Sequence, residues 1–139
     1  MGKRVLFADD DPSIRRLVQD LLQQYGYQVT VAKTGEACLD MARAHPPDLI
    51  VLDVMMPGMN GFDVCQELRR DARLREIPVV ILTGIQDAKV NERAFAAGAE
   101  VCMTKPFRPD NLLTSVHMAL QNAAQKRRQT EKKMVKPGE

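Results

Sequence analysis

The chain lacks several features that would assign it to other classes of protein. It has no tryptophan among its 139 residues, and aromatic residues make up only 4% of it. No apolar stretch approaches the roughly 18 residues of a membrane span, and the basic N-terminus leads into a predicted strand instead of a signal-peptide core. We therefore expect a soluble, cytoplasmic protein without a membrane partner.

Cysteine is also scarce. Cys38, Cys65 and Cys102 are an odd number of thiols at wide spacing, and no C-x-x-C pair occurs. This pattern excludes a disulfide framework and gives no zinc-binding signature. We expect reduced, mostly buried thiols.

Charge is distributed unevenly along the chain. The net charge is +2, but residues 121–139 hold six basic and two acidic residues, a net +4, which leaves −2 for the rest. The basic run has no interleaved aromatics and no nucleic-acid recognition motif, so a solvated helix or linker is favoured over nucleic-acid binding. We predict one domain over residues 1–121 and a basic helical extension or linker over residues 122–139.

Short apolar runs alternate with amphipathic segments along the domain. The runs predict strands over residues 4–8, 27–32, 49–52, 79–82 and 101–103. The segments between and after them predict five helices, with Asp11, Thr34 and Asn60 as N-caps of the first three and the fourth over residues 87–97. The first helix has the clearest apolar stripe, formed by Ile14, Leu17, Val18, Leu21, Leu22 and Tyr25. The alternation indicates an α/β fold, a doubly wound parallel sheet with helices on both faces.

The third apolar run carries the most information about function. Residues 49–52 do not alternate with polar residues, so we predict a central strand covered on both faces. Asp53 then lies at the carboxyl end of that strand, where ligand sites form in open α/β sheets. Because Pro57 and Gly58 break the chain soon afterwards, we expect the loop to turn away and leave the carboxylate uncovered.

Other strands also end on polar groups. The first ends on Asp9 and Asp10, the fourth on Thr83 and the fifth on Lys105. Two carboxylates about 4 Å apart repel by about 4 kcal/mol at an effective dielectric near 20, so such a cluster takes up a proton or a cation. Mg²⁺ prefers these oxygen ligands, and Lys105 and the Thr83 hydroxyl suit the stabilisation of a phosphoryl group.

The sequence resembles the receiver domain of two-component response regulators over roughly residues 3–121, because several short motifs of that family occur here in the same order. The matching segments are Val5 to Asp10, Pro12 to Arg15, Leu52 to Gly61, Leu82 to Gly84, Gly98-Ala99 and Lys105 to Phe107. The resemblance implies a flavodoxin-like five-stranded sheet in the order 2-1-3-4-5. It also implies a phosphoacceptor signalling domain and not an enzyme in the usual sense.

The same resemblance implies a role for each site residue. Asp53 would accept a phosphoryl group from the phosphohistidine of a sensor histidine kinase or a phosphotransfer protein. Asp10, Asp53 and the Met55 backbone carbonyl would bind Mg²⁺, with Asp9 helping through water. Thr83 and Lys105 would contact the phosphoryl oxygens and remodel the face of helix four, strand five and helix five, which would control an output domain or a downstream protein. A homodimer through the same face is a separate expectation, which no particular residue of the sequence supports.

Two positions depart from the family pattern. Relatives often carry an aromatic switch residue three positions before the lysine, where this chain has Cys102, so we expect phosphorylation to be read by another route. Met55 and Ile85 occupy positions that in relatives set the lifetime of the acyl phosphate. Since neither side chain can hydrogen-bond an attacking water, we predict slow self-dephosphorylation.

Two other functions fit parts of the sequence. The run Asp9-Asp10-Asp11 also matches the D-x-D motif at the start of haloacid-dehalogenase-like phosphatases. In such an enzyme Asp9 would be the nucleophile and Mg²⁺ would be required, but this hypothesis leaves Asp53 without a role. A flavodoxin-like binding or scaffold module without phosphorylation is the third possibility.

Overall fold

The computed structural model of the chain describes residues 2–85 and 87–134. Strands and helices alternate, as predicted, in the order β1 (Arg4–Ala8), α1 (Pro12–Gln24), β2 (Gln28–Ala32), α2 (Gly35–Ala44), β3 (Leu49–Asp53), α3 (Gly61–Arg70), β4 (Val79–Thr83), α4 (Ala88–Ala96), β5 (Val101–Thr104) and α5 (Pro109–Met134).

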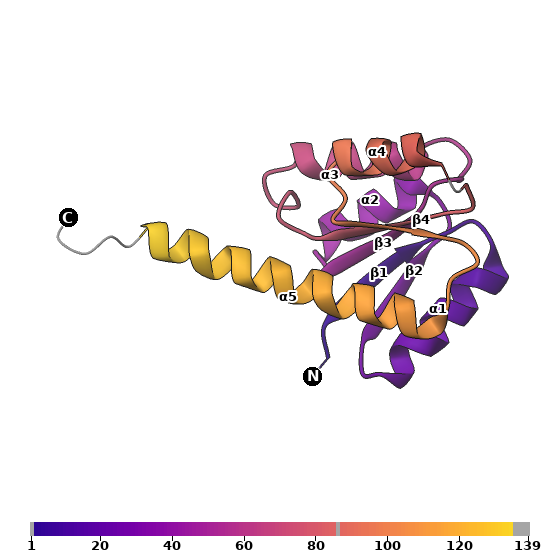
Figure 1. The fold of residues 1–139 in the computed structure, drawn as a ribbon, viewed down its shortest axis with the longest axis horizontal. Coiled ribbons are helices and arrows are strands. Elements are labelled where there is room, and N and C mark those ends of the chain that lie inside the picture. The colour runs from indigo at the N-terminus through magenta and orange to yellow at the C-terminus, as the bar shows by residue number, and fades with distance from the viewer. Residues whose placement is uncertain (1, 86, 135–139) are drawn as a thin grey trace.

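The strands form one parallel sheet in the order β2-β1-β3-β4-β5, which confirms the predicted fold and strand order. Helices α1 and α5 lie on one face of the sheet, and α2, α3 and α4 lie on the other (Figure 1). Because all strands run in the same direction, their carboxyl ends meet at a single edge.

Each face of the sheet has its own core. One apolar cluster joins the sheet to α2, α3 and α4, and the other joins it to α1 and α5. Every residue of β3 and β4 is buried, so the prediction of a strand covered on both faces is confirmed.

The helix starts follow the predicted caps. The side chains of Asp11, Thr34 and Asn60 accept hydrogen bonds from backbone amides in the first turns of α1, α2 and α3. The fourth helix is one residue shorter at each end than predicted, because Asp87 caps α4 instead of starting it.

The predicted stripe of α1 is only partly buried. Val18 and Leu22 have no exposed surface, whereas Leu17 and Tyr25 are 54% and 65% exposed, so the apolar stripe extends beyond the buried face of the helix. Leu17 lies at the edge of the stripe, where it lines a hollow of about 340 Å³ with Phe107, and Tyr25 lies beyond the last turn as the C-cap.

Helix α5 continues without a break past residue 121 and projects beyond the sheet (Figure 1). Its buried side chains are Leu112, Val116, Ala119 and Ala123. The division of the chain at residues 121 and 122 stays a prediction. Within the described residues, no helix combines the length and hydrophobicity that a bilayer crossing requires.

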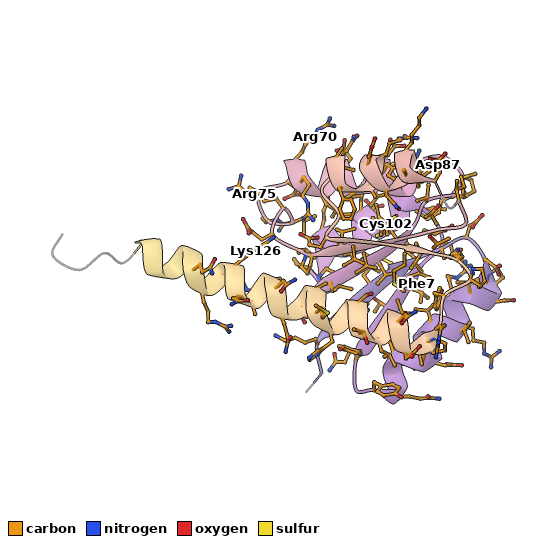
Figure 2. All side chains as sticks on the ribbon, in the orientation of Figure 1. Phe7, Arg70, Arg75, Asp87, Cys102 and Lys126 are labelled. Carbon is orange, nitrogen blue, oxygen red and sulfur yellow. The ribbon has the colours of Figure 1, made fainter. Side chains whose placement is uncertain are left out.

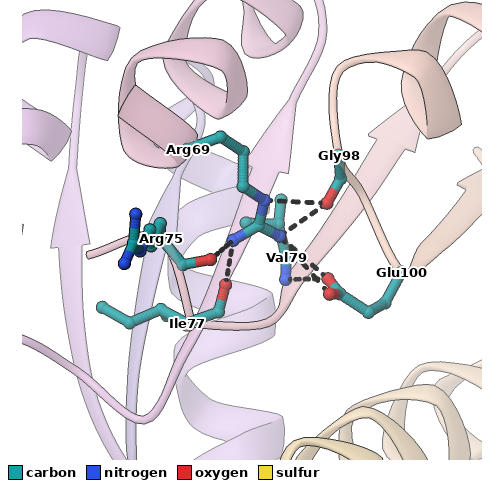
Figure 3. A network of polar contacts seen from close by, with 6 residues as sticks. All are labelled: Arg69, Arg75, Ile77, Val79, Gly98 and Glu100. Carbon is teal, nitrogen blue, oxygen red and sulfur yellow. Dashed lines mark hydrogen bonds and ion pairs between the residues drawn. The ribbon is translucent and has the colours of Figure 1, made fainter. Parts of the chain in front are cut away.

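A polar network braces the end of the sheet that lies opposite the carboxyl ends of the strands (Figure 3). The Arg69 guanidinium donates to the carbonyl oxygens of Arg75, Ile77 and Gly98 and pairs with Glu100 at 3.1 Å. Glu100 in turn accepts the Val79 amide at 2.7 Å. Arg70, which follows Arg69 in the chain, points outward from the domain (Figure 2).

Candidate functional site

The carboxyl ends of β1 and β3 bring three carboxylates together. Asp9, Asp10 and Asp53 each offer one oxygen, and these oxygens all lie within 4.8 Å of one another. The parallel register places β1 and β3 side by side, with Ala8 opposite Leu52, so the residues that follow meet. The predicted convergence of these three residues is therefore observed.

Asp9 is buried, and its side chain and its backbone carbonyl both form polar contacts. It is 1% exposed, its Oδ1 accepts the Asp11 amide at 2.9 Å, and its Oδ2 lies 2.9 Å from Nζ of Lys105. Arg15, one turn into α1, donates to the Asp9 carbonyl oxygen at 2.8 Å. Both carboxylate oxygens are thus already engaged, while Asp10 beside it is exposed.

Asp53 is less open than the sequence indicated. The residue is 4% exposed, so the expectation of an uncovered carboxylate was wrong. The loop after β3 does turn, but Lys105 reaches across from the end of β5 and places its Nζ 2.9 Å from Asp53 Oδ1. The ammonium group, itself on a side chain that is 22% exposed, covers the carboxylate.

The environment shifts the pKa of both partners. Burial raises the pKa of Asp53, the hydrogen bond from Lys105 opposes the rise, and the charges of Asp9 and Asp10 add to it. Burial lowers the pKa of Lys105, but its hydrogen bonds to Asp53 and Asp9 outweigh burial, so the pKa is raised overall. The lysine is therefore held in its charged form between two carboxylates.

The other two predicted site residues lie at the same edge. Thr83 is completely buried, and its Oγ1 accepts the Ile85 amide at 3.0 Å, which leaves the hydroxyl hydrogen for another acceptor. Met55 follows two residues after Asp53, with its side chain 64% exposed. In the part of the chain that the structure describes, no hydrogen bond joins the Thr83 side chain to the carboxylates.

The donor set fits a hard divalent cation. Three carboxylate oxygens within 4.8 Å of one another supply more negative charge than the single ammonium of Lys105 neutralises. Mg²⁺ takes oxygen ligands and usually combines one or two carboxylates with waters and a phosphate. The exposed Asp10 leaves room for the waters.

Two supporting residues could not be found from the sequence. Arg15 lies one turn after Asp11, the N-cap of α1. Nothing in the sequence marks the contact of Arg15 with the Asp9 carbonyl oxygen. Glu36 lies 23 residues before Met59, whose amide it accepts at 3.2 Å, and only the folded chain brings the two together.

Comparisons with known sequences agree on one family. A profile described as the response regulator receiver domain matches residues 5–117. The chain is 42% identical over 117 residues to the DNA-binding dual master transcriptional regulator RpaA of Synechocystis, and 38% identical over 118 residues to a probable transcriptional regulator, ycf27, of Cyanophora paradoxa. These matches cover 84% and 85% of this chain but 48% of each relative, so the chain spans about half the length of these curated relatives.

Solved structures give the same answer. The chemotaxis protein CheY4 of Vibrio cholerae superimposes with a TM-score of 0.82 at 33% identity, covering 86% of this chain and 99% of that one. NtrX of Brucella abortus superimposes with a TM-score of 0.88 at 26% identity, covering 99% of this chain and 31% of that one. The phosphatase alternative finds no support in these comparisons.

Proposed function

Because this chain belongs to the response regulator receiver family, we propose that it is a phosphorylation-controlled switch in which Asp53 accepts the phosphoryl group. Receiver domains of transcriptional response regulators are signalling proteins and not enzymes in the usual sense. The observation that carries the proposal is the meeting of Asp53 with two further carboxylates and with Lys105 at the carboxyl edge of the sheet.

The proposed reaction transfers a phosphoryl group from a histidine of a partner kinase or phosphotransfer protein. An Asp53 carboxylate oxygen attacks phosphorus, the P–N bond of the phosphohistidine breaks, and its electron pair returns to the imidazole. The product is an acyl phosphate on Asp53. Such transfers depend mainly on positioning and on neutralising charge on the equatorial oxygens.

Asp10, Asp53 and the Met55 carbonyl oxygen are the proposed direct ligands of Mg²⁺, with Asp9 acting through water. The bound ion supplies positive charge to the phosphoryl oxygens. Asp9 suits an indirect role, since its two carboxylate oxygens already bind the Asp11 amide and Lys105.

Lys105 and Thr83 are the proposed contacts to the transferred group. Lys105 has a flexible stem, so its ammonium can turn from the Asp53 carboxylate to the oxygens of the incoming phosphoryl group as Asp53 attacks. The Thr83 hydroxyl hydrogen is available to donate to the same oxygens.

The proposed output surface is the face of α4, β5 and α5. On this face, Phe95 of α4 and Met118 of α5 are 54% and 53% exposed. Thr83 is the last residue of β4, and Lys105 directly follows β5, so movement of these two residues would alter this face. The relatives are named as transcriptional regulators, so we propose that the chain controls an output domain or a downstream protein. Homodimerisation through this face stays a prediction.

The test is treatment with acetyl phosphate and Mg²⁺ followed by peptide mass spectrometry. We expect a phosphoryl adduct on Asp53 that disappears in Asp53→Asn and that requires Mg²⁺. An intact protein without an adduct would favour the scaffold alternative. Turnover that survives in Asp53→Asn but is lost in Asp9→Asn would contradict the proposal.

A further inference from the structure

The loop between β3 and α3 carries the proposed Met55 ligand, and the folded chain fixes this loop at two places. At its base, Val54 and Met56 are buried, and the Val54 amide continues the sheet by donating to the Leu82 carbonyl oxygen at 3.0 Å. Met55 lies between these two anchors with its side chain exposed. The position of its carbonyl oxygen is set by these two anchors and, beyond Met56, by how the tip of the loop is held.

The second place is the tip of the loop, which rests on α2. Glu36, in the first turn of α2, accepts the Met59 amide through Oε1 at 3.2 Å. Gly58 has φ +75°, and a Cβ built there would lie 3.0 Å from the same Glu36 oxygen. The carboxylate thus lies directly against the Gly58-Met59 turn.

The backbone of α2 also approaches the loop closely. A Cβ at Gly35 would lie 2.9 Å from the Met59 carbonyl oxygen and 2.7 Å from a Val64 methyl group, so only glycine fits. This contact brings the start of α2 near enough for the neighbouring Glu36 to reach the Met59 amide. The loop tip is therefore held by one side-chain acceptor on a rigid helix.

We infer that Glu36 is a positioning residue for the metal site: its hydrogen bond to the Met59 amide holds the loop so that the Met55 carbonyl oxygen can bind Mg²⁺. The inference rests on the proposed function and extends it to a residue 17 positions before Asp53. Partners that orient metal ligands typically change affinity by 10–100-fold when removed. Because Glu36 is exposed, the expected effect is smaller, about three- to tenfold.

Three variants separate the hydrogen bond from the charge. Glu36→Ala removes the acceptor, and Glu36→Gln keeps an acceptor oxygen without the charge. Asp40→Ala is the matched control, since Asp40 is an exposed acid on the same helix, paired only distantly with Arg43 at 3.9 Å. Two readouts apply: hydrogen exchange of the Met59 amide by NMR, and the Mg²⁺ dissociation constant by calorimetry without any phosphodonor.

We expect Glu36→Ala to speed exchange of the Met59 amide severalfold and to raise the Mg²⁺ dissociation constant about three- to tenfold. Glu36→Gln should stay within about twofold of the unchanged protein, and Asp40→Ala should match it. Unchanged Mg²⁺ affinity in Glu36→Ala, or an equal loss in Glu36→Gln or Asp40→Ala, would overturn the inference while leaving the proposed function intact. Failure of the unchanged protein to bind Mg²⁺ would instead remove the metal requirement from the proposed function, and this inference with it.

Discussion

Nζ of Lys105 lies 2.9 Å from Oδ1 of Asp53, across the gap between the ends of β5 and β3. The same nitrogen lies 2.9 Å from Oδ2 of Asp9, so a single cation serves two carboxylates that have almost no exposed surface. The two ion pairs connect the central strands β1 and β3 to the edge strand β5, whose neighbour in the sheet is β4. The lysine is consequently important for stability as well as for the proposed chemistry.

Replacing Lys105 with methionine should destabilise the fold in metal-free buffer. The change leaves two buried carboxylates uncompensated, and because Lys105 is partly exposed we expect a loss of about 2 kcal/mol in the free energy of unfolding at pH 7. Urea denaturation with and without Mg²⁺ measures it. Saturating Mg²⁺ should recover most of the loss, since the ion takes over the charge of the ammonium.

Lys33→Met is the control for this change. Lys33 is an exposed lysine that follows the end of β2, and we expect its replacement to shift stability by less than about 0.5 kcal/mol. If both variants unfold at the same urea concentration as the unchanged protein, the two ion pairs contribute nothing measurable.

Asp53→Asn should stabilise the protein. Because the pKa of Asp53 is raised in the fold, its ionised form is disfavoured there, and the penalty is complete above the folded-state pKa. We expect the variant to gain about 1 kcal/mol at pH 7. The gain should shrink as pH falls through the folded-state pKa and vanish below the ordinary value of 3.8, as thermal unfolding across pH would reveal. A gain that grows on acidification would contradict this account.

Met55→Asn combined with Ile85→Glu should shorten the lifetime of phosphorylated Asp53. Both native side chains are apolar, and they are 64% and 46% exposed near the site, so neither can orient an attacking water. Polar groups at these positions can, and we expect decay at least about tenfold faster. Phosphoprotein gel assays over time measure the decay, with Met118→Asn as the control, since Met118 is a 53% exposed methionine on α5. An unchanged half-life in the double variant would refute the idea.

Arg69→Met should weaken the opposite end of the sheet. The substitution removes the Arg69 donor from the carbonyl oxygens of Ile77 and Gly98 and the cation from the Glu100 carboxylate, and we expect a loss of about 2–3 kcal/mol. Chemical denaturation compares it with Arg70→Met, which removes a neighbouring arginine whose side chain is 72% exposed and pairs with Glu67 on the surface. The control should lose less than about 0.5 kcal/mol. Equal losses in the two variants would argue against a specific role for the network.

The strands and the caps could be predicted because each depends on local pattern, and the shared edge of Asp53, Asp9 and Asp10 follows once the sheet is parallel. Uninterrupted apolar runs define buried strands, and a parallel sheet then fixes where their ends lie. The strand order came from the family resemblance, since residues 4–8 pair with residues 28–32 and 49–52 through register that no local pattern specifies.

Long-range side-chain contacts could not be predicted. The sequence placed Lys105 at the correct edge but gave no sign that it covers Asp53, because that depends on how a flexible side chain crosses from β5. Leu17 shares the helical periodicity of Val18 yet remains exposed, since periodicity marks a face and not how far the core extends beneath it. The contacts of Glu36 with Met59 and of Arg69 with Gly98 join residues more than 20 positions apart and have no signature in the sequence.

Helix α5 has the shape of a lever, fixed on the sheet at one end and projecting beyond it at the other (Figure 1). Among the side chains described, up to residue 129, the last buried one is Ala123, and the helix runs on to Met134, about 16 Å further at 1.5 Å per residue. A rotation of about 10° where the helix rests on the sheet would carry its far end through roughly 3 Å. Small rearrangements at the base of this helix are therefore magnified at a distance from the acidic edge of the sheet.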